Sequence, residues 1–326
     1  MSMHWRDIDR RLEPGVWDGL LISIASDRKP GFVVSVCPPD RLRVSVRDEP
    51  LCWARIDDDH YGYEILRRGR NASWAIVPPI PFRLADDIAK SSLDAGMRRW
   101  SRQFATWLWE STRAPLMAGE WMLGPHMRWH KDAMLAPGDI EGILAHEARE
   151  YIDWDHEVHP LPLRDMSSPD DGRVKAWRKL ARRGELPPIL LYWVSGLVAY
   201  VVLDGHDRLL AARLERTPAA FLCLDRVAEF HRDMEHQQTV LAAVGMAIEH
   251  SDRTKGGANR DARTFTAEKA NRILLEAFVP RLAEQPTVAD AKLVSRSLWE
   301  SEVVAEAERL GVDVAEMIAE ASGRDR

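Results

Sequence analysis

The chain has 326 residues, of which 45% are hydrophobic and 29% are charged, and its formal net charge is −6. This length is sufficient for two or three domains with a sizeable core, and the composition is typical of a soluble protein. The negative charge argues against a chain that mainly coats nucleic acid, although a local basic face is compatible with it.

The first region, residues 1–82, is predicted to be β-rich. Turn signals such as Lys29-Pro30-Gly31 separate short apolar, β-branched runs. We expect strands at residues 20–24, 32–36, 42–46, 52–56, 63–66 and 74–77. The acidic stretch at residues 57–60 offers ligands for a metal ion, but an acidic turn between two strands is the commoner structure, so no metal is assigned to it.

Residues 83–150 are predicted to form a helical, aromatic connecting region. A proline-rich break at residues 78–81 precedes a helix that we expect at residues 84–112. Large apolar side chains recur at helical spacing along it, namely Trp100, Phe104, Trp107 and Leu108. Such a stripe is typical of a core or a domain interface rather than of a ligand site.

Histidines are concentrated near the end of this region. Five of the 11 lie between residues 124 and 159, namely His126, His130, His146, His156 and His159. Two pairs among them have the spacing of metal ligands. Prolines adjoin the outer members, however, and residues 146–150 lack the second His of the H-E-x-x-H zinc motif. We therefore interpret them as scattered, solvated histidines and assign no metal site.

Residues 151–226 are predicted to form a central mixed α/β domain. Its uncharged stretch at residues 186–203 is just long enough for a membrane span. Pro187 and Pro188 open this stretch, and Ser195-Gly196 divides it into two strand-length runs. We therefore expect a pair of adjacent strands and no membrane partner.

The second of these strands leads directly into Asp204-Gly205-His206-Asp207-Arg208, where helical spacing begins. The start of a helix has free N–H groups and a partial positive charge, which together suit an anion, phosphate above all. Gly205 permits a close ligand approach, Arg208 can bind phosphate oxygens with two donors, and His206 can exchange a proton near neutral pH. The alternative is structural: Asp204 or Asp207 caps the helix, and Arg208 pairs with a nearby carboxylate.

This strand, turn and helix resemble the signature of the ParB/sulfiredoxin superfamily, in which a G-x-x-R or D-G-H-H-R turn binds nucleotide phosphates. The family's first strand, first helix, second strand and closing strand resemble residues 159–164, 174–184, 185–191 and 217–224. The resemblance covers only residues 151–226, and it has three departures. Asp207 replaces the family's second His, no E-N-x-Q-R motif follows the closing strand, and the turn has no cysteine for reducing a cysteine sulfinic acid.

The resemblance implies a protein that binds a nucleotide or a phosphorylated small molecule through residues 204–208. By analogy with kinases of the family, Asp165 would activate a substrate hydroxyl, with Glu185 as a weaker candidate, and His206 would assist in catalysis. If a nucleoside triphosphate binds, Mg²⁺ is the expected cofactor. Whether the chain is an enzyme stays open. The alternatives are a nucleotide-responsive, DNA-associated protein of the partition type and a non-catalytic interaction module.

The helix at residues 174–184 has a basic outer face, formed by Arg173, Lys175, Arg178, Lys179, Arg182 and Arg183. We favour a solvated face over a nucleic-acid contact.

Residues 227–326 are predicted to be all-helical, with Gly311 as a cap between the last two helices. The many glutamates of those helices argue against DNA binding, because contact with phosphates needs Lys and Arg.

In fold class the chain is predicted to be α+β, with a β-rich N-terminal region, a ParB/sulfiredoxin-like mixed α/β domain and a helical C-terminal region. Cys37, Cys52 and Cys223 form no C-x-x-C motif, which favours a reduced, cytoplasmic protein. Residues 1–7 carry charges where a signal peptide needs an apolar core, which agrees with that interpretation.

Overall fold

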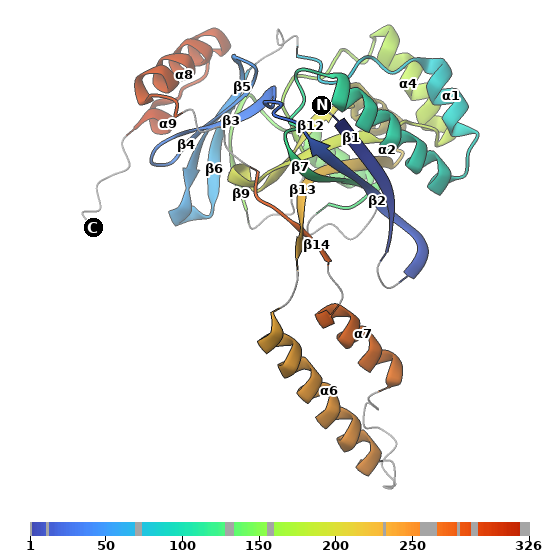
Figure 1. Cartoon of the computed structure of the whole chain (residues 1–326). Coiled ribbons are helices and arrows are strands. Elements are labelled where there is room, and N and C mark those ends of the chain that lie inside the picture. Colours follow the sequence, from blue (N-terminus) through green and yellow to red (C-terminus); the bar gives the residue numbers. More distant parts are fainter. Residues whose placement is uncertain are drawn as a thin grey trace.

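The body of the molecule consists of two β-sheets with helices packed on them, and a pair of helices projects from it (Figure 1). The computed structural model describes residues 2–10, 13–68, 74–127, 134–154, 160–230, 233–254, 266–278, 281–287 and 293–319. Helices and strands alternate irregularly along these residues, and the larger sheet is mixed, which is consistent with the expected α+β class.

The larger sheet joins strands from distant parts of the sequence. Its order is β1 (Ser2–Arg10), β2 (Glu13–Ala25), β7 (Gly119–Gly124), β13 (Ala219–Phe230), β11 (Ile189–Val194), β12 (Ala199–Asp204) and β10 (Leu161–Pro162). Two short strands also pair with β13, namely β8 (Met134–Leu135) and β14 (Arg281–Glu284). The β10–β12 and β11–β13 pairs are parallel, and the remaining pairs of this sheet are antiparallel. Strands from all four predicted regions therefore share one sheet.

The adjacent strands expected within residues 186–203 are confirmed. β11 and β12 form an antiparallel pair, joined by the short 3₁₀ helix η2 (Ser195–Leu197) and by Val198, which has φ 49°. All six residues of β11 are buried, as expected for a strand covered on both faces. Among the described residues, no helix is long and apolar enough to span a membrane.

The smaller sheet is antiparallel, with the order β3 (Phe32–Cys37), β4 (Arg41–Val46), β5 (Glu49–Asp57), β6 (Gly62–Arg67) and β9 (Arg149–Asp153). η1 (Asp58–His60) forms the turn between β5 and β6. The expected strand at residues 74–77 is wrong, because that segment pairs with no strand and its apolar side chains enter the core from an irregular backbone.

The helix expected at residues 84–112 is two helices, α1 (Phe82–Ala89) and α2 (Leu93–Glu110). Ser92 interrupts the run, since its hydroxyl accepts a hydrogen bond from the Ala95 amide and so begins a new helix. The predicted stripe is buried at Trp100, Phe104 and Leu108. Three further helices follow, namely α3 (Pro137–Leu144), α4 (Gly172–Arg183) and α5 (His206–Glu215).

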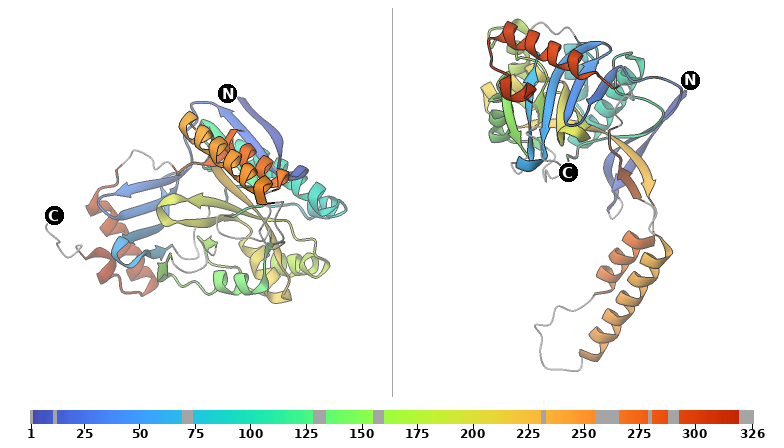
Figure 2. Two further views of the ribbon diagram at one scale, coloured as in Figure 1. Left: turned by 90° about the horizontal axis from the view of Figure 1, so that it is seen from below. Right: turned by 90° about the vertical axis from the view of Figure 1, so that its left-hand side faces the viewer.

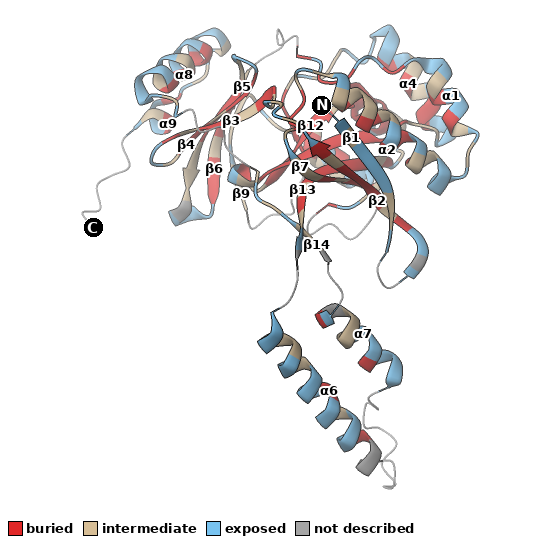
Figure 3. Ribbon diagram, in the orientation of Figure 1, coloured by how far each residue is buried: buried red, intermediate tan, exposed pale blue. Residues whose placement is uncertain are grey.

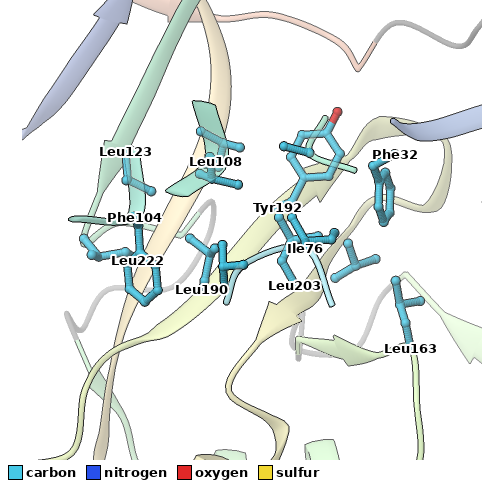
Figure 4. Packing of buried hydrophobic residues seen from close by; sticks show 14 of the residues in the cluster. Phe32, Ile76, Phe104, Leu108, Leu123, Leu163, Leu190, Tyr192, Leu203 and Leu222 are labelled. Atoms are coloured by element: carbon cyan, nitrogen blue, oxygen red, sulfur yellow. The ribbon is translucent and has the colours of Figure 1, made fainter. Parts of the chain in front are cut away.

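One hydrophobic core extends across most of the body. It includes Trp17, Phe104, Leu190 and Leu222, which come from the N-terminal, connecting and central regions. Figure 4 shows Phe104 beside Leu222 and Leu190, and Ile76 beside Leu203 and Tyr192. Because these regions share buried apolar surface, their folding is coupled.

The prediction that residues 227–326 are all-helical needs correction. β13 continues to Phe230, and β14 pairs with this extension, because a strand that runs past its sheet has an edge that another strand can cover. The helices are α6 (Met234–Thr254), α7 (Ala267–Phe278), α8 (Arg296–Leu310) and α9 (Ala315–Ile318). The predicted cap at Gly311 is confirmed, with φ 69°.

α6 and α7 pack against each other and extend away from the body, as the right-hand view of Figure 2 shows. Most of their described residues are exposed or half-buried (Figure 3). α8 instead lies on the smaller sheet, where Trp299 and Val303 pack against Cys37 and Trp53. The two sheets, α4 and α5 position the site described next.

Candidate functional site

The polar turn lies where β12 ends and α5 begins. Gly205 has φ 113° and ψ 11°, a backbone conformation that favours glycine. An added Cβ there would lie 2.9 Å from Ile189 Cδ1 and 3.0 Å from Arg208 Nη2. Gly205 is the N-cap residue, and among the described residues no side-chain hydrogen bond caps the helix start, so the alternative in which Asp204 or Asp207 caps the helix does not hold. The first N–H groups of α5 are left for another partner.

A cavity of about 270 Å³ opens beside this turn. Its wall combines the turn with residues 74–79, with the segment after β10 and with the first half of α4. The side chains that matter most are Trp74, Arg164, Asp165, Arg173 and Trp177, together with residues 204–208. Asp165 and the turn, which are separate candidates in the sequence, therefore lie at one cavity.

Glu185, the weaker catalytic candidate, is not at this cavity. It lines a different one and pairs with Arg183 at 2.5 Å. Trp74, Arg164, Arg173 and Trp177 were not assigned to a site from the sequence. Arg164 lies in a segment that resembles the family and Arg173 adjoins another, whereas Trp74 lies in a run whose pattern predicts a strand, so nothing in the sequence connects it with the turn.

Arg208 is a buried guanidinium, only 2% exposed. Its Nη2 donates to Asp204 Oδ2 at 2.8 Å and to the Pro188 carbonyl oxygen at 2.9 Å. The predicted pairing with a nearby carboxylate therefore exists. The guanidinium also lies over the Trp177 ring, 5.8 Å from its centroid. Its Nε is buried and has no hydrogen-bond partner among the described residues.

His206 is 1% exposed and meets the Trp74 ring edge-to-face, with ring centroids 6.1 Å apart. Burial lowers the pKa of His206 well below 6.5, and the nearby charges of Arg164 and Arg208 lower it further. The imidazole is therefore neutral at pH 7. Its Nε2 is buried without a hydrogen-bond partner in the described parts of the chain.

Asp165, Asp204 and Asp207 bring carboxylates to the cavity. Asp204 binds Arg208 and Asp207 accepts from Arg164 at 3.5 Å, and the Asp165 side chain is exposed. Where residues are described, no group of three His, Cys, Asp or Glu side chains is arranged to hold a metal. The donor set therefore fits Mg²⁺ poorly, because its oxygens are shared with guanidinium groups.

The other metal candidates form pairs rather than clusters. His60 Nδ1 lies 2.8 Å from Asp57, His126 Nε2 lies 2.9 Å from Asp18, and His146 Nδ1 lies 2.7 Å from Glu150. His130, His156 and His159 lie outside the described residues.

The basic face of α4 is largely occupied by internal ion pairs. Arg178 and Arg182 bind Glu215 at 2.5 and 2.8 Å, and Arg183 binds Asp86 at 3.1 Å. Arg173 lines the cavity, at the end of α4 nearest the turn. This face therefore joins α4 to α5 and presents one arginine to the site.

Comparisons with protein-family models, with curated proteins and with solved structures found no match to this chain.

Proposed function

We propose that the chain binds a phosphate group, either of a nucleotide or of a phosphorylated small molecule, at the turn formed by residues 204–208. One observation carries the proposal: the uncapped start of α5 meets a buried Arg208 and a buried His206, whose Nε and Nε2 have no hydrogen-bond partner among the described residues. Free helix N–H groups and buried donors together provide the environment that an anion requires. The resemblance to the ParB/sulfiredoxin superfamily supports the same conclusion.

Phosphoryl transfer is the second step of the proposal. Asp165 lies at the same cavity as the turn and is exposed, so it could accept the proton of a substrate hydroxyl. A neutral His206 would donate a hydrogen bond to a phosphate oxygen without adding charge. No step is assigned to Mg²⁺, since Asp204 and Asp207 at the cavity are shared with arginine.

Nucleic-acid binding of the partition type has less support. On the basic face of α4, Arg178, Arg182 and Arg183 already form ion pairs. Their partners are the carboxylates of Glu215 and Asp86 in the same chain. Such pairs neutralise the charge that a phosphate backbone would need. A non-catalytic interaction module on the same fold would keep the buried turn but bind no phosphate.

The proposal is tested by a thermal-shift screen with ATP, ADP, CTP, GTP and inorganic phosphate, each with and without Mg²⁺. A ligand that binds only the folded chain raises Tm by mass action. We expect at least one phosphate compound to raise Tm of the wild type, and Arg208→Ala to abolish the shift. Because Arg208 is buried, Arg173→Ala serves as a second variant that retains the fold and weakens binding. Arg183→Ala, at the far end of α4, is the control. If no compound shifts Tm, the interaction module becomes the better interpretation.

A further inference from the structure

We propose that the cavity encloses a compact tetrahedral dianion, the size of a phosphate monoester group, and that the Trp74 indole N–H donates to it. This inference rests on the proposed function and names its ligand class and a further binding residue. It also assigns the selectivity of the site to residues 74–79, which lie outside the segment that resembles a known family.

The first support is the set of unpaired donors at the cavity. Nε1 of Trp74, Nε2 of His206 and Nε of Arg208 are all buried, and none has a hydrogen-bond partner among the described residues. Each belongs to a residue that lines the cavity. Buried polar groups in native proteins are nearly always hydrogen-bonded, so three unpaired donors at one cavity indicate a missing partner.

The partner must be rich in acceptors. An indole N–H and a guanidinium N–H can only donate, and a neutral imidazole donates in the tautomer that carries its proton on Nε2. The N–H groups at the start of α5 are donors as well. A tetrahedral oxyanion has several acceptor oxygens directed to different sides, and can therefore serve donors from a loop and from a helix at once.

The cavity has room for the ligand, because its volume of about 270 Å³ is larger than a phosphate group. The rings of Trp74 and Trp177 form part of the wall. Trp177 lies between Arg208 and Phe82, and the centroids of the Phe82 and Trp177 rings are 4.5 Å apart.

Trp74 places the N-terminal part of the chain in the site. Its ring is 4% exposed and lies edge-to-face against His206. The next residues, Ile76 and Val77, are anchored in the main core, which fixes the indole against the turn. Removing only the N–H, as Trp74→Phe does, leaves an aromatic side chain in the same place.

The experiment measures Kd by isothermal titration calorimetry for inorganic phosphate, methyl phosphate and AMP. Wild type, Trp74→Phe and Trp121→Phe are compared, and unfolding by urea is followed without ligand. Trp121 is the matched control, since it is buried in the core and its Nε1 already donates to the Met117 carbonyl oxygen at 3.0 Å.

We expect Trp74→Phe to weaken phosphate binding about tenfold or more, as the loss of a hydrogen bond to a charged group does. Trp121→Phe should leave Kd unchanged. Without ligand, the two variants should differ in stability in the opposite sense. Trp74→Phe should unfold at no lower urea concentration than wild type, because it removes an unpaired donor. Trp121→Phe should unfold at a lower urea concentration than wild type, because it loses a hydrogen bond. AMP and methyl phosphate should bind wild type with equal Kd.

Two results would overturn the inference and leave the proposed function standing. One is equal phosphate affinity of Trp74→Phe and wild type. The other is AMP that binds more than about tenfold tighter than methyl phosphate, because the nucleoside would then contribute to binding. If no phosphate compound binds the wild type, the inference and the proposed function both fail.

Discussion

Asp204 and Arg208 form an ion pair across the first turn of α5, with Arg208 Nη2 donating to Asp204 Oδ2 at 2.8 Å. The two side chains differ sharply in burial, since that of Arg208 is 2% exposed and that of Asp204 is 25% exposed. The aspartate therefore compensates a buried charge that water cannot reach. The carbonyl oxygen of Pro188, the residue before β11, accepts a second hydrogen bond from the same Arg208 Nη2. This arrangement fixes the guanidinium beside the cavity before any ligand arrives.

Because Arg208 is more deeply buried than Asp204, removing either side chain should lower the free energy of unfolding by a different amount. Asp204→Ala leaves a buried guanidinium without its counter-charge, and we expect it to lower the free energy of unfolding by about 2–4 kcal/mol. Arg208→Met leaves a carboxylate that water can reach, so its cost should be smaller. Urea unfolding of both variants measures the difference, and equal costs would contradict the assignment of Asp204 as the compensating partner.

His206 makes the stability of the protein depend on pH. Its folded-state pKa is lowered well below 6.5 by burial, then by Arg164 and Arg208, so below pH 6.5 the unfolded chain takes up a proton that the folded chain does not. Stability is therefore retained above pH 6.5 and falls as the pH decreases, by up to about 1.4 kcal/mol per pH unit.

The measurement is urea unfolding between pH 5 and pH 7.5 for wild type and His206→Gln. The loss of stability on acidification should be less steep in the variant by about one proton. Addition of saturating phosphate should reduce the loss in wild type, because a bound anion favours the imidazolium. Parallel pH profiles for the two proteins would show that His206 does not titrate as described.

Alanine substitutions at Gly205 and Gly184 distinguish the cost of backbone strain from a direct effect on the binding site. Both have positive φ, 113° and 69°, but an added Cβ at Gly184 meets nothing within 4 Å, whereas one at Gly205 meets Ile189 and Arg208. We expect Gly184→Ala to cost about 1 kcal/mol of stability and to leave phosphate binding unchanged. Gly205→Ala should cost more and weaken binding, because it displaces Arg208. Calorimetry with inorganic phosphate distinguishes the two variants, and unchanged binding by Gly205→Ala would argue against the site.

Glu302 attaches α8 to the smaller sheet. It accepts hydrogen bonds from Arg43 Nε at 2.8 Å and Nη2 at 2.9 Å, and from Trp53 Nε1 at 2.8 Å. Glu302→Ala should lower the free energy of unfolding by about 1–3 kcal/mol, a range reduced for the partial exposure of the pair. Glu300→Ala, which removes an exposed pair with Arg296 on the same helix, should cost about 0.5 kcal/mol or less. If the two variants unfold alike, α8 does not depend on Glu302.

The sequence by itself determined the elements whose signals are local. The β11–β12 pair follows from two apolar runs interrupted at Ser195-Gly196. α4 follows from its caps, since the Asp171 side chain accepts from the Arg173 amide at 2.7 Å and Gly184 ends the helix in the left-handed region. Each of these features depends on residues a few positions apart, so composition and spacing are sufficient to place it.

Only the tertiary structure decided what surrounds the turn. β7, a strand from the connecting region, lies between β2 and β13 in the larger sheet. Trp74 contacts His206 although the two residues are more than a hundred positions apart in the sequence. The basic face of α4 is mostly exposed, as expected, but Arg178 and Arg182 also pair with Glu215 and so join α4 to α5. Contacts of this kind depend on which distant surfaces become buried together, and no local pattern in the sequence encodes that choice.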